Sequence, residues 1–220
     1  MAEFLALNLR MPEHILIIFI TGCFMLQPIS TDLYLHDTMF VVGHFHFTMA
    51  AGSVLGAFTG LYFWFPKLYG KSLDERLGKL HFWFTTLGLS AVFGGQLLVG
   101  WAGQQRRLFD PYQYTFIQGL HPLNTWTSIA AFTLFAGQLF FVWNFFKTLF
   151  FTKATGDRNP WGVPTLEWTD AASPPAYHNF DRIPHVVRGP HHLSDPAVTK
   201  ALGRDFLGQA EPAPAGASEA

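Results

Sequence analysis

The sequence contains only one cysteine, Cys23, which lies in an apolar run. A single cysteine can form no disulfide within the chain and cannot hold a metal ion alone, so disulfide scaffolds and cysteine-based metal sites are excluded. We expect Cys23 to be a small buried side chain. The formal net charge of −1 also lacks the excess of Lys and Arg that a nucleic-acid-binding surface needs. No nucleic-acid partner is therefore expected.

Charged residues of both signs are scarce, at 13% of the 220 residues, whereas 50% are apolar and 17% are aromatic. This balance is typical of a membrane protein. The sequence has no internal repeat, no glycine-rich phosphate loop and no Ser/His/Asp constellation. Arg10, Pro12 and Glu13 interrupt the first apolar run, so the N-terminus does not resemble a cleaved signal. We expect insertion through spans that the protein retains.

Four apolar stretches are each near or above the roughly 20 residues that cross a bilayer. The sequence therefore predicts an all-α membrane protein with four transmembrane helices. The predicted helices run from about Phe4 to Met25, Thr38 to Phe65, Leu80 to Trp101 and Trp126 to Phe151. Pro66 and Gly70 are expected to stop the second helix, His81 to lie near the start of the third, and His121 and Pro122 to lie in the loop before the fourth.

Positive charge in the short loops predicts the orientation, because loops rich in Lys and Arg stay on the cytoplasmic side. The connection after the second helix carries four such residues, Lys67, Lys71, Arg76 and Lys79. Both termini are accordingly expected in the cytoplasm. The predicted division is a transmembrane region over residues 1–156 and a Pro-rich, partly disordered cytoplasmic extension over residues 157–220. Arg106 and Arg107 depart from the charge pattern by lying on the outer side.

Two histidines near the outer end of the second helix are candidate ligands. A polar side chain inside a membrane span is costly unless it binds something. At about 100° per residue, His44 and His46 project roughly 200° apart, so one ion cannot take both from a helix. The pattern suits two metal centres on either side of the helix, and imidazole is a common axial ligand of haem iron. The alternative is that both rings hydrogen-bond to neighbouring helices.

Several segments resemble the catalytic subunit of the haem-copper oxidases, subunit I of cytochrome c oxidase. LHDTMFVVGHFHF at 35–47 resembles the haem-ligating signature of its tenth helix, and FWFPKLYGKSLDERLGKLHFW at 63–83 resembles the loop and helix that follow. GQQRRLFDPY at 103–112 resembles the arginine-pair loop. NPWGVPTLEWT at 159–169 and SPPAYHNF at 173–180 resemble the C-terminal motif. The matches occur in the family's order over about residues 22–180.

The resemblance implies roles for individual residues. His44 corresponds to the axial ligand of the high-spin haem, at the catalytic centre, and His46 to one ligand of the low-spin haem. The two cofactors would be haems of the haem A type. Phe45 would lie between them. His191 and His192 invite a copper interpretation, but they lie in the soluble extension without a third ligand, so we do not expect a metal site there.

The resemblance also implies roles for the polar residues outside the helices. His36 and Asp37 match a pair that binds magnesium and contacts haem propionates at the interface with subunit II. Arg106 and Arg107 match two arginines that bind the propionates, which accounts for their positive charge on the outer side. Two alternatives remain open: Asp37 could be a helix cap, and the arginines could belong to a solvated loop.

The family's copper ligands, its active-site tyrosine and the second ligand of the low-spin haem belong to its first eight helices. None of those motifs is in this sequence, which would begin at the ninth helix. We therefore interpret the chain as the C-terminal portion of a split subunit I, with a truncated reading frame as the alternative. Gln104 and Gln105 stand where the family usually has Met and Pro, which leaves the proposed ligands unchanged.

The implied function is electron transfer from cytochrome c to oxygen, which is reduced to water with proton pumping, in a bacterial-type inner membrane. Implied partners are the N-terminal subunit I chain with the copper ligands, subunit II with its copper centre, subunit III, cytochrome c and lipid. Two alternatives are kept. One is a quinol oxidase or nitric oxide reductase fragment, and the other is a non-catalytic assembly or scaffold protein of the same fold.

Overall fold

The computed structural model describes residues 29–154, 157, 159–176, 178–180, 182–187, 189 and 207–212. The chain divides into two compact units. Unit 1 comprises Met1–Tyr62 and Asp74–Lys147, and unit 2 comprises Phe63–Leu73 and Thr148–Ala220. The described residues contain helices and loops but no strand, so the predicted all-α class is confirmed for this part of the chain.

The described part of unit 1 begins with the short helix α3 (Ile29–Leu35), which leads into a long helical run. This run consists of α4 (Met39–Met49), a π-helical turn η2 (Ala50–Val54) and α5 (Leu55–Tyr69). Thr38 caps its start, because the Thr38 hydroxyl accepts a hydrogen bond from the Phe40 N–H at 3.2 Å. The predicted second helix is thus present.

The far end of this run differs from the prediction. Pro66 was expected to stop the helix, but α5 continues through it to Tyr69. A proline so close to the end removes only one backbone hydrogen bond, and Pro66 is fully buried. The chain instead leaves the helix at Gly70, whose φ of +64° is accessible to glycine without strain.

Helix α6 (Glu75–Trp101) begins five residues before the predicted start at Leu80. Asp74 explains the difference, because its carboxylate accepts hydrogen bonds from the N–H groups of Arg76 and Leu77. The helix ends where Gly103 adopts a φ of +91°. The short turns η3 (Pro111–Gln113) and η4 (Gln118–Leu120) connect it to α7 (His121–Phe151).

Helix α7 also begins earlier than predicted, with His121 as its first residue instead of a loop residue. Pro122 occupies the first turn, where its missing N–H would have no helical partner in any case. The described chain has three helical runs long and apolar enough to cross a membrane, Met39–Tyr69, Glu75–Trp101 and Gln118–Phe151. These correspond to three of the four predicted spans, and the predicted span from Phe4 to Met25 lies outside the described residues.

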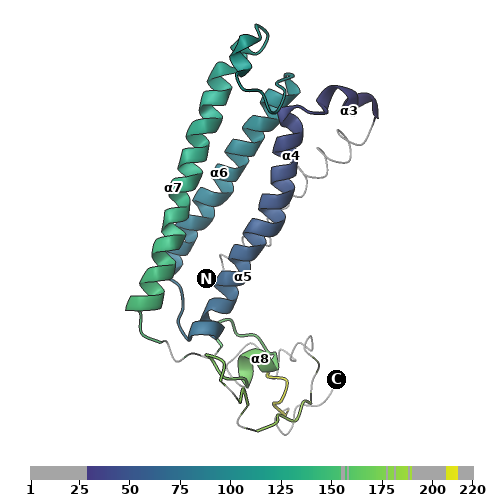
Figure 1. Cartoon of the computed structure of the whole chain (residues 1–220). Coiled ribbons are helices and arrows are strands. Elements are labelled where there is room, and N and C mark those ends of the chain that lie inside the picture. The colour runs from purple at the N-terminus through teal and green to yellow at the C-terminus, as the bar shows by residue number, and fades with distance from the viewer. Residues whose placement is uncertain are drawn as a thin grey trace. The chain divides into compact units, whose positions relative to one another are not determined.

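Close contacts join the helices of unit 1, in which α4, α6 and α7 run side by side (Figure 1). A methyl group added to Gly100 of α6 would lie 1.8 Å from the Phe40 nitrogen, and one on Gly43 would lie 2.8 Å from the Phe93 carbonyl oxygen. A methyl group added to Gly95 would lie 2.4 Å from the hydroxyl oxygen of Thr127 in α7. Helix packing in unit 1 therefore depends on glycines at the contact points.

Unit 2 is built around Lys67 and the short helix α8 (Leu166–Thr169). The Lys67 ammonium group, almost fully buried, donates to the carbonyl oxygens of Glu167 and, at 2.9 Å, of Ala171. It also lies 5.8 Å from the centroid of the Trp168 ring, close enough for a cation–π interaction. The segments 63–67 and 159–173, far apart in the sequence, thus meet in one folded unit.

Candidate functional site

His36 and Asp37 lie in the turn between α3 and α4. Asp37 has a φ of +60°, a left-handed conformation that is uncommon for residues with a side chain and that Asp adopts more readily than most. The turn pairs with the loop after α6, because the Arg106 N–H donates to the Asp37 carbonyl and the Met39 N–H donates to the Gln104 carbonyl, both at 2.9 Å. Two segments almost 70 residues apart are thereby held together.

The side chain of Arg106 strengthens this pairing. Its Nε donates to Asp37 Oδ1 at 2.7 Å, and a terminal guanidinium nitrogen contacts the same oxygen. The hydrogen bonds from Arg106 hold the pKa of Asp37 below its ordinary value, so the carboxylate is ionised at neutral pH. Arg107 follows with a φ of +63°. The structure thus brings the predicted acidic residue and the predicted arginine pair together.

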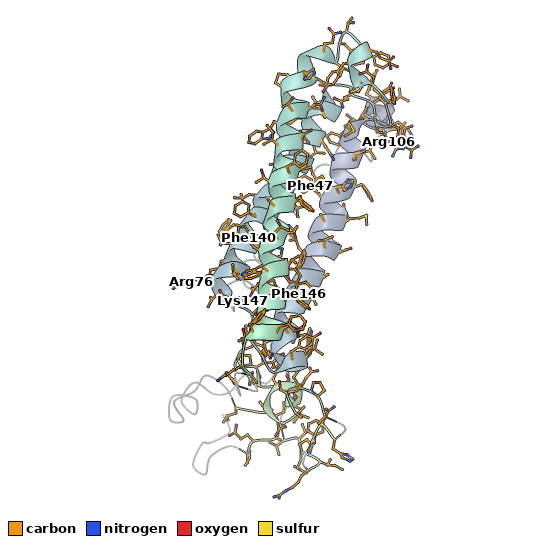
Figure 2. All side chains as sticks on the ribbon, turned by 60° about the vertical axis from the view of Figure 1, so that its left-hand side comes forward. Phe47, Arg76, Arg106, Phe140, Phe146 and Lys147 are labelled. Atoms are coloured by element: carbon orange, nitrogen blue, oxygen red, sulfur yellow. The ribbon has the colours of Figure 1, made fainter. Side chains whose placement is uncertain are left out.

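These residues surround a polar hollow of about 510 Å³ within unit 1. Its lining residues are Leu33, Tyr34, His36, Asp37, Thr38, Gly103, Gln105, Arg106 and Arg107. Figure 2 shows Arg106 at one end of the helices, with Arg76 and Lys147 towards the other. With two guanidinium groups in its wall, the hollow is suited to anionic groups such as carboxylates.

His36 and Asp37 also present two possible metal ligands. His36 Nε2 lies 3.5 Å from Asp37 Oδ2, the oxygen that Arg106 does not contact. The two side chains are 67% and 57% exposed, so a ligand from another chain could reach them. No three His, Cys, Asp or Glu side chains converge on one point within the described residues. Within the described residues the pair therefore offers two side-chain ligands at most.

His46 is held in one orientation by α4 and α6. Its Nδ1 lies 2.8 Å from the Val42 carbonyl oxygen, which can only accept, so Nδ1 carries the proton. The ring stacks on Phe93 of α6, with centroids 4.7 Å apart and planes 18° apart. In this tautomer Nε2 has the free electron pair that a metal ligand needs. The geometry of His46 thus fits an axial haem ligand.

His44 lies two residues earlier in α4, and the regular helix from Met39 to Met49 places the two rings on opposite sides. Both side chains are half-buried, and Phe45 between them is 47% exposed. The small residue Gly43 and the buried Phe47 face α6 instead. The helix can therefore present each imidazole to a different centre.

Sequence reasoning missed a buried polar cluster between α5, α6 and α7. His81, expected near a helix start, is 1% exposed in the second turn of α6, because the helix begins earlier than predicted. Its Nε2 lies 3.1 Å from Gln138 Oε1, and its Nδ1 lies 3.5 Å from the Tyr62 hydroxyl. Gln138 also donates to the Thr85 hydroxyl at 2.9 Å. A glutamine inside an apolar span was the signal that could have predicted it.

A second cluster joins the start of α6 to α7. Asn144, fully buried, accepts from the Asp74 N–H and donates to the Asp74 carbonyl, both at 2.9 Å. The Lys147 ammonium group lies 2.9 Å from Asp74 Oδ2. The hydrogen bond from Lys147 lowers the pKa of Asp74. This cluster positions α7 against α6 and lies outside the candidate site.

Comparison with known proteins gives consistent matches. Residues 14–133, just over half of the chain, match the family described as Cytochrome C and Quinol oxidase polypeptide I. The chain is 39% identical over 189 residues to cytochrome c oxidase subunit 1 of Corynebacterium diphtheriae, which covers 84% of this chain and 33% of that protein.

Two further relatives are similar. The alternative cytochrome c oxidase subunit 1 of Bradyrhizobium diazoefficiens is 36% identical over 90% of this chain and 33% of its own length. Cytochrome c oxidase subunit 1 of Synechocystis is 40% identical over 76% of this chain and 29% of its own length. The chain thus spans about a third of the length of these relatives.

Proposed function

The chain belongs to the cytochrome c and quinol oxidase polypeptide I family, and from this membership we propose that it forms the C-terminal part of the catalytic subunit of a respiratory terminal oxidase. The complete enzyme would transfer electrons from cytochrome c to oxygen, with coupled proton pumping. The relatives named as cytochrome c oxidase subunit 1 are about three times as long, so the activity would require the remaining helices of the subunit as well.

In this proposal His44 binds the iron of the high-spin haem and His46 that of the low-spin haem. The observation that carries it is the geometry of α4, in which two half-buried imidazoles lie on opposite sides of one regular helix. The hydrogen bond from His46 Nδ1 to the Val42 carbonyl supports the second role, because it leaves Nε2 for the metal. When bound, the haems and the partner chain's copper supply the electron transfer and the oxygen chemistry.

The polar hollow would bind the haem propionates. Arg107 and the Arg106 guanidinium would neutralise these carboxylates, and the Asp37 contact would keep Arg106 in place. His36 and Asp37 would contribute two ligands to a magnesium ion, with the rest supplied by water and subunit II. Their high exposure supports a site shared with another chain.

The proposed location is a bacterial-type inner membrane or an equivalent respiratory membrane. The three apolar helical runs support insertion. The positive charges on the loop from Lys67 to Lys79 support a cytoplasmic position for that loop and for the C-terminal extension. Subunit II, subunit III and lipid complete the proposed surroundings.

Oxygen consumption by the purified complex tests the proposal. We expect uptake when reduced cytochrome c is the electron donor, and no uptake when the partner chain is absent. Uptake with a quinol and none with cytochrome c would identify a quinol oxidase instead. If the complete complex consumes no oxygen with either donor, the scaffold alternative is supported and an oxidase is contradicted.

A further inference from the structure

A groove runs between α6 and α7 of unit 1, and none of the candidate site residues lines it. Its volume is about 410 Å³. Large side chains form its walls, namely Trp83 and Leu87 of α6 and Trp126 and Ile129 of α7, which are 46% to 61% exposed. The hydroxyl of Thr133 in the lining donates to the Ile129 carbonyl of its own helix at 3.0 Å. The groove is therefore apolar in character and open to the surroundings of unit 1.

Small residues form the floor of this groove, namely Gly88, Ala91 and Ala130. The two helices approach closely here, since a methyl group added to Gly88 would lie 2.9 Å from Leu134 Cβ. Large walls on a small floor make a narrow slot. Such a slot suits a slender hydrocarbon chain, whereas a helix is about 10 to 12 Å across and needs a broader face. The acyl chain of a lipid therefore fits the groove better than a helix of another chain.

A positive charge lies in line with the α6 wall of the groove. At about 100° per residue, Arg76, Leu80, Trp83, Leu87 and Ala91 fall within an arc of about 80° around α6. The line that these residues form along the helix begins with Arg76, in the first turn of α6. Arg76 is exposed and lies near the lower end of the helices, at the edge of the group (Figure 2).

The guanidinium group of Arg76 is available for an anion. The two neighbouring carboxylates contact other cations, because Glu75 lies 3.3 Å from the Lys79 ammonium group and Asp74 lies 2.9 Å from that of Lys147. Within the described residues, the side chain of Arg76 forms no ion pair. A guanidinium group can bind a phosphate through two parallel hydrogen bonds. Arg76 is thus suited to a phosphate at the end of the apolar groove.

The dimensions of α6 match those of a phospholipid. At 1.5 Å per residue, Arg76 lies about 10 Å along the axis from Trp83. The groove continues for about 12 Å from Trp83 to Ala91, which is shorter than the about 15 Å of hydrocarbon in one leaflet. Tryptophan side chains favour the level between headgroups and hydrocarbon. Headgroup, interface and acyl region thus follow one another in the order that a lipid requires.

We infer that the groove binds an anionic phospholipid, whose phosphate contacts Arg76 and one of whose acyl chains lies between α6 and α7. The lipid belongs to the leaflet in which α6 begins, which is the cytoplasmic leaflet in the proposed orientation. This inference rests on the proposed insertion in a membrane, which the three apolar helical runs support. It does not depend on the proposed haem ligands.

Native mass spectrometry tests the inference on the complex purified in nanodiscs with equal amounts of phosphatidylglycerol and phosphatidylcholine. Ala91→Phe fills the groove and should retain one lipid fewer per chain than the wild type, and the lost lipid should be phosphatidylglycerol. The matched control is Ala131→Phe, which adds the same ring at an exposed residue of α7 that does not line the groove. The control should retain the wild-type number of lipids.

The contribution of the headgroup is tested without filling the groove. Arg76→Gln should lower the ratio of phosphatidylglycerol to phosphatidylcholine in the groove about fivefold, since a basic residue near an anionic membrane surface contributes about that factor. Arg76→Lys should keep most of the preference. Lys153→Gln, which removes the same charge from an exposed residue after α7, should leave the ratio unchanged.

Three results would overturn the inference. One is an unchanged number of lipids in a folded Ala91→Phe complex, and another is equal retention of the two lipids in the wild-type groove. The third is release of another protein chain by Ala91→Phe instead of a lipid, which would assign the groove to a helix. The haem spectrum of the same samples keeps the proposals apart, because a complex without haem bands that still retains the lipid would contradict only the proposed function.

Discussion

At the scale of single residues, His46 is the side chain whose surroundings match its proposed role most fully. Its Nδ1 is committed to the Val42 carbonyl and its ring is stacked on Phe93. Replacing it with alanine should remove the low-spin haem band from the reduced-minus-oxidised spectrum, because no other nitrogen would occupy that coordination position. Helix content should not change, since the residue is only half-buried.

The matched control for this substitution is His121→Ala. His121 lies at the start of α7, where its ring stacks on that of Tyr112 with centroids 4.0 Å apart, and it is not one of the candidate ligands. The control complex should keep both haem bands. An unchanged spectrum in His46→Ala, with the protein folded, would refute the ligand assignment.

Asp74 allows a prediction about pH. The hydrogen bond from Lys147 lowers its pKa in the folded protein, so its ionised form contributes stability above the ordinary aspartate value of about 3.9. That contribution is lost as the pH falls through the lowered pKa. Asp74→Asn can still cap α6 but cannot titrate. The thermal midpoint of the complex should therefore fall more steeply below about pH 4 in the wild type than in the variant, as measured by circular dichroism.

The effect of Asp74→Asn should be small at neutral pH. The Asp74 and Lys147 side chains are 34% and 40% exposed, so solvent screens the pair and its loss should cost no more than about 1 kcal/mol. If the thermal midpoints of the wild type and the variant change with pH in parallel, titration of Asp74 does not affect the stability of the folded protein.

The sequence predicted residue types at the site better than residue geometry. The histidines of α4 and the arginine pair could be identified because polar groups stand out in an apolar chain. The contact between Asp37 and Arg106 could not, because it depends on positive φ angles at Asp37 and Arg107 and on a backbone pairing across almost 70 residues. Pairings between distant segments leave no local pattern in a single sequence.

At the scale of helices, glycine determines how closely α4 approaches α6. Gly100→Ala would place a methyl group 1.8 Å from the Phe40 nitrogen, so the two helices would have to separate at the end that carries the site. Overpacking of this kind typically costs about 1 to 3 kcal/mol. We expect a lower thermal midpoint and weaker haem retention.

Gly94→Ala serves as the control on the same helix. A methyl group at Gly94 has open space around it, and alanine favours the helix by about 0.5 to 1 kcal/mol relative to glycine. The variant should melt at or above the wild-type temperature. Equal midpoints for Gly100→Ala and Gly94→Ala would contradict the close contact.

The anchoring of α8 in unit 2 depends on Lys67. Lys67→Met keeps the length and apolar stem of the side chain but leaves the carbonyls of Glu167 and Ala171 without their donor. The loss of such buried hydrogen bonds costs about 1 to 3 kcal/mol. Residues after 157 should be cleaved faster in limited proteolysis. Lys79→Met, which removes an exposed pair with Glu75 in unit 1, should be cleaved at the wild-type rate.

Helix positions were predicted well and helix ends less well. The spans were found from length and hydropathy, whereas Asp74 and Pro122 extended α6 and α7 beyond their apolar cores through capping and first-turn geometry. The contacts of the C-terminal segment were also missed. The side chain of Gln209 accepts a hydrogen bond from the Leu166 N–H, and its backbone N–H donates to the Pro164 carbonyl. Its neighbours Gly208 and Ala210 give no local pattern that predicts these contacts.

At the scale of the whole molecule, this chain corresponds to about a third of the length of its relatives. Its three described apolar runs expose large surfaces, and its relatives are about three times as long. The composition could predict a membrane protein, and the sequence motifs could predict its family. Neither could show which sides of the helices remain exposed, because that depends on how the helices pack against one another after folding.

The central claim is that His44 and His46 bind two different haem irons. Haem content and carbon monoxide binding of the purified complex test it most directly. We predict two haems for each copy of the chain, of which the one held by His44, at the proposed catalytic centre, takes up carbon monoxide and the one held by His46 does not. A complex with no haem, with a single haem, or with two haems that both bind carbon monoxide would contradict this account.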